Sequence, residues 1–416
     1  MKLLLWMAYY PLFKIVSMFV FWIPAYQERS RFEKQNCLEP LCESFKLTGL
    51  TADLCFEFSS EGEYQQVASL IDDALKAGKR IELVFFSPSV EKAIVNLARN
   101  HQSQIRYLRY PLIRFSPFGN GRCFSSWITS KKLIMVRYDL FPEFLSWAGE
   151  ADNELVMLWM SFKKERVKQK NISWMKKKFL SRSSKIVYAS LPDQELGMQL
   201  GFPGSCYDFR MEQIKRRVAL KESKFASMFV QYQELKANWE SIPPHKRLII
   251  GNVWPSDLFL FELLPKDVFV LVVPHKLTPE ILKAMHEGLT RTGRSVIEIS
   301  DGSTVKSGDT FILNKKGVLC ELYADFGLAY VGGGFEAGVH SILEPLVAGS
   351  ETIACGEAHH RSTEYDVARG FGRMTEVKTP QAFLEWLTKD HIVPGEKSLS
   401  LVFEKYEKYR KDVISC

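Results

Sequence analysis

The chain has 416 residues, which is long enough for two or three domains. Apolar residues make up 46% and charged residues 25%, which fits a globular protein and excludes a disordered or low-complexity chain. The net charge of +7 permits an anionic partner such as phosphate, nucleic acid or an acidic membrane, but does not require one.

The most apolar stretch covers residues 3–26, at the N-terminus. Pro11 and Lys14 interrupt it, so three structures are open: a strained membrane span, a helix in the membrane interface, or a buried N-terminal helix. Its tryptophans and tyrosines are typical of the headgroup level, and the positive charges after it place the downstream chain in the cytoplasm. We therefore predict a membrane-associated segment over residues 1–35.

From about residue 50 onward, short apolar strands alternate with amphipathic helices. The predicted strands lie at 54–59, 80–87, 105–110, 132–138, 154–160 and 185–190, and again at 247–252, 268–274, 295–300, 310–314, 327–333 and 352–356. This alternation predicts parallel sheets with right-handed crossovers, and ligands at the carboxyl ends of the strands. We expect two Rossmann-like domains, at 36–210 and 246–416, joined by a charged helical linker over 211–245.

The first candidate for chemistry is Ser60-Glu61-Gly62-Glu63, directly after the first strand. One interpretation is a capping box, in which Ser60 is the N-cap residue and Glu63, three residues on, completes the hydrogen bonds at the start of the helix. The other makes Glu63 a general base at the carboxyl end of the sheet. The residue pattern alone leaves both open.

A second candidate is VGGGFEAGVHSILEP, residues 331–345, where a glycine turn follows a strand. A helix is predicted to begin near Gly338, so that the turn and the helix N-terminus would bind an anion. Glu344 would lie in the second helical turn, within reach of a ribose, unless it is a solvated or salt-bridged carboxylate. His340 would contact the anion or serve a structural role.

Two further strand ends carry candidate residues. GNVWPSD, residues 251–257, predicts a strand-to-helix turn with the helix beginning at Pro255 and Ser256. VPHK, residues 273–276, places His275 and Lys276 where they could meet phosphate, or leaves them as surface loop residues.

Residues 163–185 hold ten Lys or Arg against one acid, Glu165. The stretch is either a solvated helix face, an anionic-membrane surface or a nucleic-acid contact. Because the same chain begins with an apolar segment, we favour the membrane and expect no nucleic-acid partner.

Several familiar motifs are absent from the sequence. No Asp-x-Asp, GxxxxGK[ST], GxSxG or HExxH occurs, so we expect no metal on a sugar diphosphate and no common ATPase site. The eight cysteines include no Cys-x-x-Cys pair, and Cys55, Cys320 and Cys355 lie in apolar runs typical of core thiols.

Together these segments resemble the bacterial Kdo transferase family, which attaches 3-deoxy-D-manno-oct-2-ulosonic acid (Kdo) to a lipid A precursor. The strongest likeness is residues 317–345; residues 251–257, 273–276 and 60–63 match further family segments. The family's proposed catalytic base carries over to Glu63. The resemblance implies a GT-B fold, a CMP-Kdo donor, an inverting reaction without metal or cofactor, and a place at the cell inner membrane with the catalytic domains on the cytoplasmic side.

The chain departs from the family pattern at five places. Asp139 begins Asp-Leu-Phe-Pro where the family has Glu-Leu-Trp-Pro, and Ser161 stands for an arginine, with Lys163 and Lys164 nearby. His275 stands for an arginine, Ser341 for an asparagine and Val318 for a glutamate.

The resemblance implies three sets of site residues: Glu63 as the base; Gly251, Asn252, Trp254, Pro274, His275, Lys276, Gly332, Gly333, Gly334, His340, Ser341 and Glu344 at the donor; and Asp139, Lys163, Lys164, Lys176, Lys177 and Lys178 at the acceptor or membrane. Two alternatives stay open. One is a GT-B glycosyltransferase with a different nucleotide-sugar donor, and the other is a noncatalytic membrane-bound sugar-binding protein.

Overall fold

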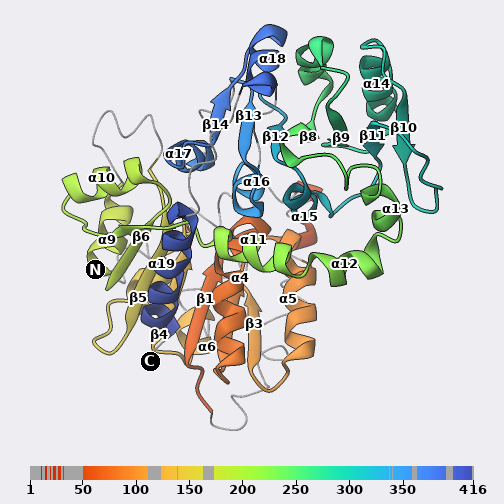
Figure 1. Ribbon diagram of the computed structural model, residues 1–416. Helices are drawn as coiled ribbons and strands as arrows, with labels where there is room; N and C mark the ends of the chain where they lie inside the picture. Colours follow the sequence, from red (N-terminus) through yellow and green to blue (C-terminus); the bar gives the residue numbers. More distant parts are fainter. Residues whose placement is uncertain are drawn as a thin grey trace. The chain divides into compact units, whose positions relative to one another are not determined.

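The apolar strands of the chain form two parallel sheets (Figure 1). The computed structural model describes residues 50–110, 123–137, 139–162, 173–336, 338–339, 341–357, 363–389 and 397–414, with isolated residues between 11 and 31. Unit 1 comprises Met1–Phe209 with Glu407–Cys416, and unit 2 comprises Arg210–Tyr406.

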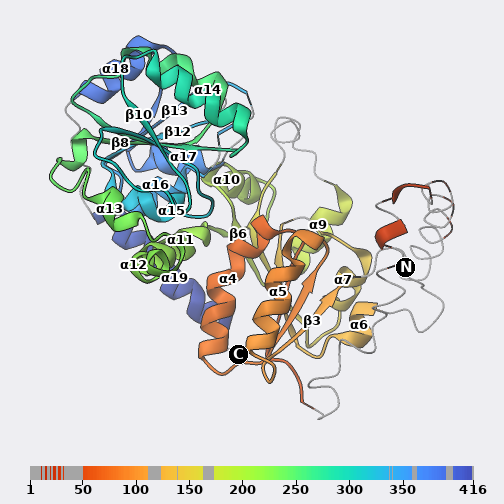
Figure 2. The ribbon, with the colours of Figure 1, turned by 90° about the vertical axis from the view of Figure 1, so that its right-hand side faces the viewer.

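The sheet of unit 1 has the strand order β3-β2-β1-β4-β5-β6-β7. Its strands are β1 (Leu54–Phe58), β2 (Ile81–Phe85), β3 (Ile105–Arg109), β4 (Lys132–Val136), β5 (Glu154–Met160), β6 (Lys185–Tyr188) and β7 (Ser205–Cys206). Its helices are α4 (Glu61–Lys76), α5 (Pro88–Asn100), α6 (Cys123–Trp127), α7 (Pro142–Trp147), α9 (Trp174–Arg182) and α10 (Leu191–Gln199). Figure 2 shows α4 and α5 side by side against the sheet. The strand order reverses between β1 and β4, which makes their carboxyl ends the switch point of this sheet.

The sheet of unit 2 has the order β10-β11-β9-β8-β12-β13-β14, and its switch point lies between β8 and β12. Its strands are β8 (Arg247–Val253), β9 (Phe269–Pro274), β10 (Val296–Ile299), β11 (Thr310–Leu313), β12 (Leu328–Val331), β13 (Thr352–Cys355) and β14 (Met374–Glu376). Its helices are α11 (Arg210–Ala219), α12 (Lys221–Met228), α13 (Tyr232–Lys236), η1 (Pro244–Lys246), η2 (Pro255–Leu263), α14 (Pro279–Thr290), α15 (Leu319–Leu322), η3 (Tyr323–Asp325), α16 (Leu343–Ala348), α17 (Thr363–Gly370), α18 (Pro380–Thr388) and the first part of α19 (Lys397–Ile414).

The strand predictions hold throughout the described sheets. Each predicted strand is present, usually with its ends trimmed by a residue or two. Sequence analysis missed β7 and β14, which have 2 and 3 residues, because edge strands this short carry no readable alternation. The helix predicted at Pro255 begins there, but it is a 3₁₀ helix.

The structure corrects the linker predicted over residues 211–245. These residues form α11, α12 and α13 within unit 2, and their apolar face is part of its core. Phe225, Tyr232 and Trp239 are at most 1% exposed and pack as a row of aromatic rings. Several of the charged residues that suggested a linker make ion pairs within the same unit.

The C-terminal boundary also differs from the prediction, because Glu407–Cys416 belong to unit 1. There the ring of Tyr409 lies 5.2 Å from that of Tyr207, and Lys185 Nζ lies 2.6 Å from Asp412 Oδ2. The last turns of α19 therefore return to the first sheet.

No helix within the described part of the chain is long and apolar enough to cross a bilayer. Most of the predicted membrane segment, residues 1–35, lies outside that part. Arg29, which is described, donates hydrogen bonds to the carbonyl oxygens of Phe86 (2.9 Å) and Tyr110, beside the carboxyl ends of β2 and β3.

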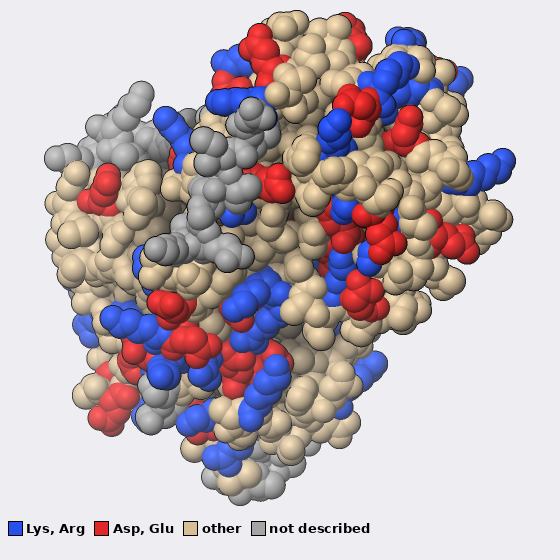
Figure 3. All heavy atoms as spheres, viewed as in Figure 1, with Lys and Arg blue, Asp and Glu red and all other residues tan. Residues whose placement is uncertain are grey.

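Surface charges are mixed on the face drawn in Figure 3, where basic and acidic side chains lie next to one another. Such intermingling weakens any single-sign field over that face, despite the net charge of +7.

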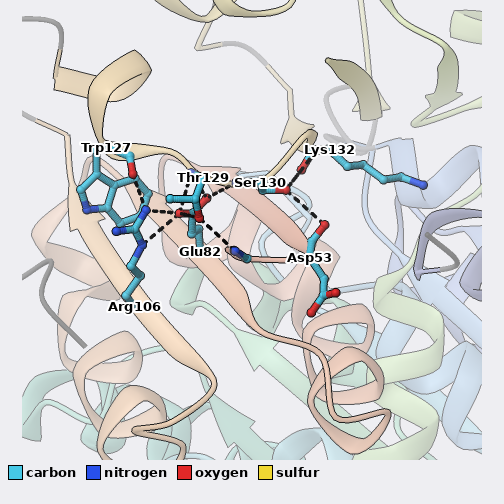
Figure 4. Close-up of polar contacts among 8 residues, drawn as sticks. Asp53, Glu82, Arg106, Trp127, Thr129, Ser130 and Lys132 are labelled. Atoms are coloured by element: carbon cyan, nitrogen blue, oxygen red, sulfur yellow. Dashed lines mark hydrogen bonds and ion pairs between the residues drawn. The ribbon is translucent and has the colours of Figure 1, made fainter. Parts of the chain in front are cut away.

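A fully buried ion pair joins the amino ends of four strands in unit 1 (Figure 4). Glu82 on β2 accepts hydrogen bonds from Arg106 Nε at 2.9 Å, from the backbone N–H and the hydroxyl of Thr129 at 2.9 and 2.8 Å, and from Ser130 N at 3.1 Å. The Arg106 guanidinium also lies 4.3 Å above the ring of Trp127. Both oxygens of the buried carboxylate therefore accept hydrogen bonds, as burial of a charge requires.

Replacing Arg106 should expose the cost of that buried charge. We expect Arg106→Leu to lower the free energy of unfolding by about 3–5 kcal/mol, since it leaves Glu82 without its counter-ion. The double variant Glu82→Met/Arg106→Leu should recover much of this loss. Arg99→Leu, an exposed change on α5, is the control and should stay within about 0.5 kcal/mol in urea unfolding. Equal stability of Arg106→Leu and Arg99→Leu would contradict the assignment.

Candidate functional site

Glu63 lies at the switch point of unit 1, in the first turn of α4. Its side chain accepts a hydrogen bond from Ser59 N at 2.6 Å, and the residue is 8% exposed. Burial raises the pKa of the Glu63 carboxyl, while the Ser59 and Ser60 amides and the charge of Arg137 oppose that rise. Ser60 is the N-cap residue, but its hydroxyl makes no capping hydrogen bond, and Glu63 accepts from the residue before the cap, so the reciprocal hydrogen bonds of a capping box do not form.

Two more carboxyl groups lie beside Glu63. Asp139 follows β4, and its pKa is raised to about 6 by burial and by the charge of Glu63. Glu57 is in the middle of β1, is fully buried, and interacts with Asp139. Burial first, and then the charges of its two neighbours, raise the pKa of Glu57 well above its usual range.

The positive charge that acts on Glu63 comes from a residue with a strained backbone. Arg137 (φ 67°) follows β4, and Trp159 (φ 54°) lies in β5 where the register with β6 shifts. The Arg137 guanidinium lies 3.5 Å from the centroid of the Trp159 ring. Bulges and left-handed non-glycine residues are common beside functional sites, because the surrounding structure must offset their cost.

Lys176 is half-buried, unlike its exposed neighbours Lys177 and Lys178. Its Nζ donates to the carbonyl oxygen of Ser161 at 2.5 Å and lies 4.8 Å from the ring of Phe162. Asp193 accepts a hydrogen bond from Phe162 N at 2.7 Å, and the charges of Lys176 and Arg137 partly offset the rise that burial causes in its pKa. The Lys176 ammonium of α9 is therefore held at the Ser161 carbonyl, directly after β5.

The other predicted acceptor lysines divide into two groups. Lys177 and Lys178 are exposed on α9, beside the half-exposed Trp174. Lys163 and Lys164 lie outside the described residues. The exposed pair, like the exposed Arg182 of the same stretch, is therefore free to meet an anionic surface.

The three glycines of the turn in unit 2 are required by close backbone packing. Gly332 N donates to Gly251 O at 2.8 Å, and a Cβ on Gly332 would lie 2.5 Å from Val253 Cα. A Cβ on Gly334 would lie 2.4 Å from Gly356 Cα. The ends of β8, β12 and β13 are thereby drawn together at the switch point.

Asp257 fixes this turn and was missed by sequence analysis as a site residue. One of its carboxylate oxygens accepts hydrogen bonds from Trp254 N at 2.8 Å and Gly333 N at 2.9 Å, and the other accepts from the Tyr330 hydroxyl at 3.0 Å. Gly333 itself has a φ of 89°, which favours glycine. Asp257 therefore locks two predicted donor segments to each other.

The remaining predicted donor residues of β8 and β9 lie together. The rings of Trp254 and His275 stack at 4.6 Å, and Lys276 Nζ lies 5.1 Å from the Trp254 ring. Asn252 (φ 53°) lies at a bulge in β8, just before Val253, which pairs with Pro274 at the end of β9. The indole N–H of Trp254 is buried without a hydrogen-bond partner among the described residues, so it is a donor available to a ligand.

The helix after the glycine turn begins later than predicted. It starts at Leu343 rather than near Gly338, so Glu344 is in its first turn. Gly338 (φ 96°) and Ser341 (φ 57°) are left-handed and cannot continue a right-handed helix through this stretch. The resulting helix has 6 residues, and its N-terminus is separated from the glycine turn. His340 lies outside the described residues.

Glu344 belongs to a charge network with helix α11. Its Oε1 lies 3.9 Å from Arg217 Nη1, and Arg217 also pairs with Glu321 at 3.0 Å. Burial raises the pKa of Glu344 to about 7; Arg217 opposes this rise, whereas Glu364 and Glu321 add to it. The side chain keeps 20% of its surface exposed, so it combines a partial ion pair with access to solvent.

The cysteines and metal-ligating residues show no second centre in the part of the chain described. Cys55, Cys320 and Cys355 are buried free thiols, as predicted, and burial raises the pKa of each. Within the described residues, no group of three or more His, Cys, Asp or Glu is arranged to hold a metal ion.

Sequence analysis missed Glu57, Arg137, Trp159 and Asp193 in unit 1. Glu57 did leave a signal, because it is the one charged residue in the strand LCFEF. The other three leave none, since left-handed backbone and spatial proximity are not written in local sequence patterns.

No protein-family model matches the chain, and no curated protein is similar to it in sequence. Solved structures do share its architecture. A glycosyltransferase from Rickettsia africae aligns over 88% of this chain and 99% of its own, at 10% identity and a TM-score of 0.52. UDP-GlcNAc 2-epimerase from Neisseria meningitidis, bound to UDP-GlcNAc, aligns over 87% and 94%, at 10% identity and a TM-score of 0.51.

The C-terminal CMP-Kdo-binding domain of WaaA from Acinetobacter baumannii aligns over 49% of this chain and 95% of its own, at 16% identity. Its TM-score of 0.33 is too low to support a conclusion. The likeness to the other two structures concerns the fold alone, and defines a GT-B-like α/β fold of two Rossmann-like units. The expected fold class is confirmed at that level.

The tight packing at Gly332 leads to a prediction about stability. We expect Gly332→Ala to lower the free energy of unfolding by about 1–3 kcal/mol, because the new methyl group meets backbone atoms that cannot move aside. Gly370→Ala is the control, since nothing lies within 4 Å of a Cβ there. Thermal unfolding of both variants measures the difference, and a Gly332→Ala protein as stable as the control would contradict the packing argument.

Proposed function

We propose that this chain is a GT-B glycosyltransferase that moves a sugar from a nucleotide-sugar donor to a hydroxyl group of an acceptor. The observation that carries the proposal is the pair of switch points. The one in unit 1 holds Glu63 among buried carboxyls, and the one in unit 2 joins a glycine turn to Trp254 and His275. Open α/β sheets bind ligands at such points, and one of the solved structures of the same fold is a glycosyltransferase.

In the proposed mechanism Glu63 is the general base. Its carboxylate takes the proton of the acceptor hydroxyl as that oxygen attacks the anomeric carbon of the donor sugar. The bond to the nucleotide phosphate breaks, and the nucleotide leaves with the bonding electron pair. Attack from the face opposite the leaving group inverts the anomeric centre. The raised pKa of Glu63 makes it a stronger base than a solvated glutamate.

On the donor side, three features of unit 2 support nucleotide binding. The unpartnered indole N–H of Trp254 offers a hydrogen bond. The exposed His275 and Lys276 next to it supply groups that favour phosphate. Glu344 is the candidate acceptor for a ribose hydroxyl, with Arg217 as its counter-ion.

The finer proposal is Kdo transfer from CMP-Kdo to a lipid A precursor at the cytoplasmic side of the inner membrane. The resemblance of residues 317–345, 251–257 and 60–63 to Kdo transferases supports it. The exposed Lys177 and Lys178, beside Trp174, are suited to an anionic headgroup surface. Flotation with anionic vesicles tests this surface, and no loss of binding when both lysines are neutralised would exclude it.

The deciding experiment combines the purified protein, CMP-Kdo and a tetraacylated lipid A precursor, with products identified by mass spectrometry. A product heavier by Kdo units supports the proposal. Inhibition of the reaction by CMP, UDP or GDP identifies the nucleotide of the donor. Inhibition by UDP or GDP but not by CMP would favour a different nucleotide sugar. No turnover with any donor, together with tight sugar binding, would favour a noncatalytic relative.

Glu63→Gln separates the base from the helix cap. Glutamine can keep the hydrogen bond from Ser59 N but cannot take a proton. We therefore expect turnover to fall by about 10²–10⁴, while stability changes by less than about 1 kcal/mol. Glu61→Gln, an exposed change in the same helical turn, is the control and should retain turnover. Near wild-type turnover by Glu63→Gln would reduce Glu63 to a cap.

Glu344 predicts a pH dependence of nucleotide binding. Because its pKa is raised to about 7, the carboxyl is mostly protonated below that pH and ionised above it. An ionised carboxylate is the better acceptor for a ribose hydroxyl, so CMP affinity should rise between pH 6 and 8 by about tenfold, the effect of roughly 1.5 kcal/mol from a hydrogen bond to a charged group.

Isothermal titration calorimetry of CMP binding at both pH values measures this rise. Glu344→Gln should lose it, whereas Glu287→Gln, a half-exposed change on α14, should keep it. An equal pH dependence in the Glu344 variant would remove Glu344 from the donor site.

A further inference from the structure

Glu57 is an acidic side chain without a solvent contact. It lies on β1 between β2 and β4, where its register partners are Val84 and Met135, and it is 0% exposed. No N–H or O–H group among the described residues donates a hydrogen bond to either of its carboxyl oxygens. Its polar contact is the carboxyl of Asp139.

This environment determines the charge of Glu57. An ionised carboxylate buried without donors costs several kcal/mol, and a second carboxylate beside it adds repulsion. A protonated Glu57 avoids both costs, because its O–H can donate to the Asp139 carboxylate. One of the Asp139 oxygens is likewise buried without another donor from the described residues. Two adjacent carboxyls that share one proton are the expected result.

The contrast with Glu82 supports this assignment. Glu82 is equally buried, near the amino end of the neighbouring strand, yet it receives hydrogen bonds from Arg106, Thr129 and Ser130. The chain therefore provides donors where it buries a charged carboxylate. At Glu57 the described residues provide another carboxyl instead.

The other ionisable groups near the pair come from several elements. On β1, Cys55 is buried and interacts with Glu57; at the start of α4, Glu63 interacts with both members of the pair; after β4, Arg137 faces Glu63; and beyond it lie Asp193 and Lys176. From β2 and β3, Glu82 and Arg106 lie toward Cys55 and pair with each other.

We propose that Glu57 and Asp139 share one proton, and that Glu57 is a positioning residue that keeps Asp139 ionised beside Glu63. The negative charge of Asp139 then favours the protonated form of Glu63, which makes Glu63 a stronger acceptor of the proton from the sugar hydroxyl. The proton sharing is a property of the free protein. Its effect on turnover rests on the proposed function.

Infrared titration of the free protein tests the sharing directly. At pH 8, where Glu344 is mostly ionised, the wild type should show the carbonyl stretch of a protonated carboxyl, which Glu57→Gln should lose and the control Glu61→Gln should retain. If Glu57→Gln keeps the wild-type signal, the proton is not on this pair and the proposal is overturned.

Thermal unfolding at several pH values is a second test. In the folded protein Glu57 keeps its proton above the pH, about 4.3, at which an unfolded glutamate loses it. The folded state then binds more protons, so the contribution of Glu57 to stability falls as pH rises. The Tm of Glu57→Gln minus the Tm of the wild type should therefore increase from pH 5 to pH 8. A constant difference over this range would overturn the sharing.

The positioning role is tested by comparing Glu57→Gln with Glu57→Leu. Glutamine can still donate to Asp139 through its amide, whereas leucine has a similar volume and no donor. We expect Glu57→Leu to lose at least tenfold in turnover and to move the acid limb of the pH profile downward, because Asp139 then takes up the proton itself and no longer raises the pKa of Glu63. Glu57→Gln should lose less and keep the limb near its wild-type position.

Identical profiles for the two variants would overturn the positioning role. If no nucleotide sugar is turned over, the proposed function fails, while the infrared and unfolding measurements still decide whether the proton is shared.

Discussion

The strand order reverses beside the first strand of each sheet, between β1 and β4 in unit 1 and between β8 and β12 in unit 2. At such a reversal the crossover helices leave to opposite faces, so no helix covers the carboxyl ends of the two central strands. The candidate residues gather at these ends. Glu63 and Asp139 follow β1 and β4, and the segments that begin at Trp254 and Gly332 follow β8 and β12. The arrangement of polar groups in each unit depends on this single topological constraint.

Buried charge is treated differently at the two ends of the unit 1 sheet. Near the amino ends, the Glu82 carboxylate is surrounded by Arg106 and by N–H and O–H donors, and the network joins strands without requiring a ligand. At the carboxyl ends, Glu57, Asp139 and Glu63 share few donors, and burial raises the pKa of all three. Groups with shifted pKa values at a sheet's ligand-binding edge are typical of functional sites. A carboxylate that serves stability alone is usually paired with a cation or with hydrogen-bond donors, as Glu82 is.

Strained backbone conformations also lie near the carboxyl ends of the strands. The four non-glycine residues with positive φ in the described chain are Arg137, Trp159, Asn252 and Ser341. Each lies at or just beyond the carboxyl end of a central strand or in the segment after the glycine turn, and two of them accompany a shift in strand register. Conformations of this kind cost of order 1–3 kcal/mol each, so the surrounding packing must hold them in place. In both units that cost is confined to the candidate site.

The sequence by itself determined the alternating strands and helices, the two-sheet architecture, and the turns that carry Glu63 and Gly332, because hydrophobic period and turn residues are local properties. It did not determine that residues 211–245 pack into a core, because the many charged residues of this stretch mask the regular spacing of the apolar residues between them. The late start of α16 and the burial of Lys176 also depended on distant contacts and on backbone dihedral angles. Only the tertiary structure placed Glu57 against Asp139. The two residues are far apart in the chain and meet because β1 pairs with β4, and that pairing is a long-range choice.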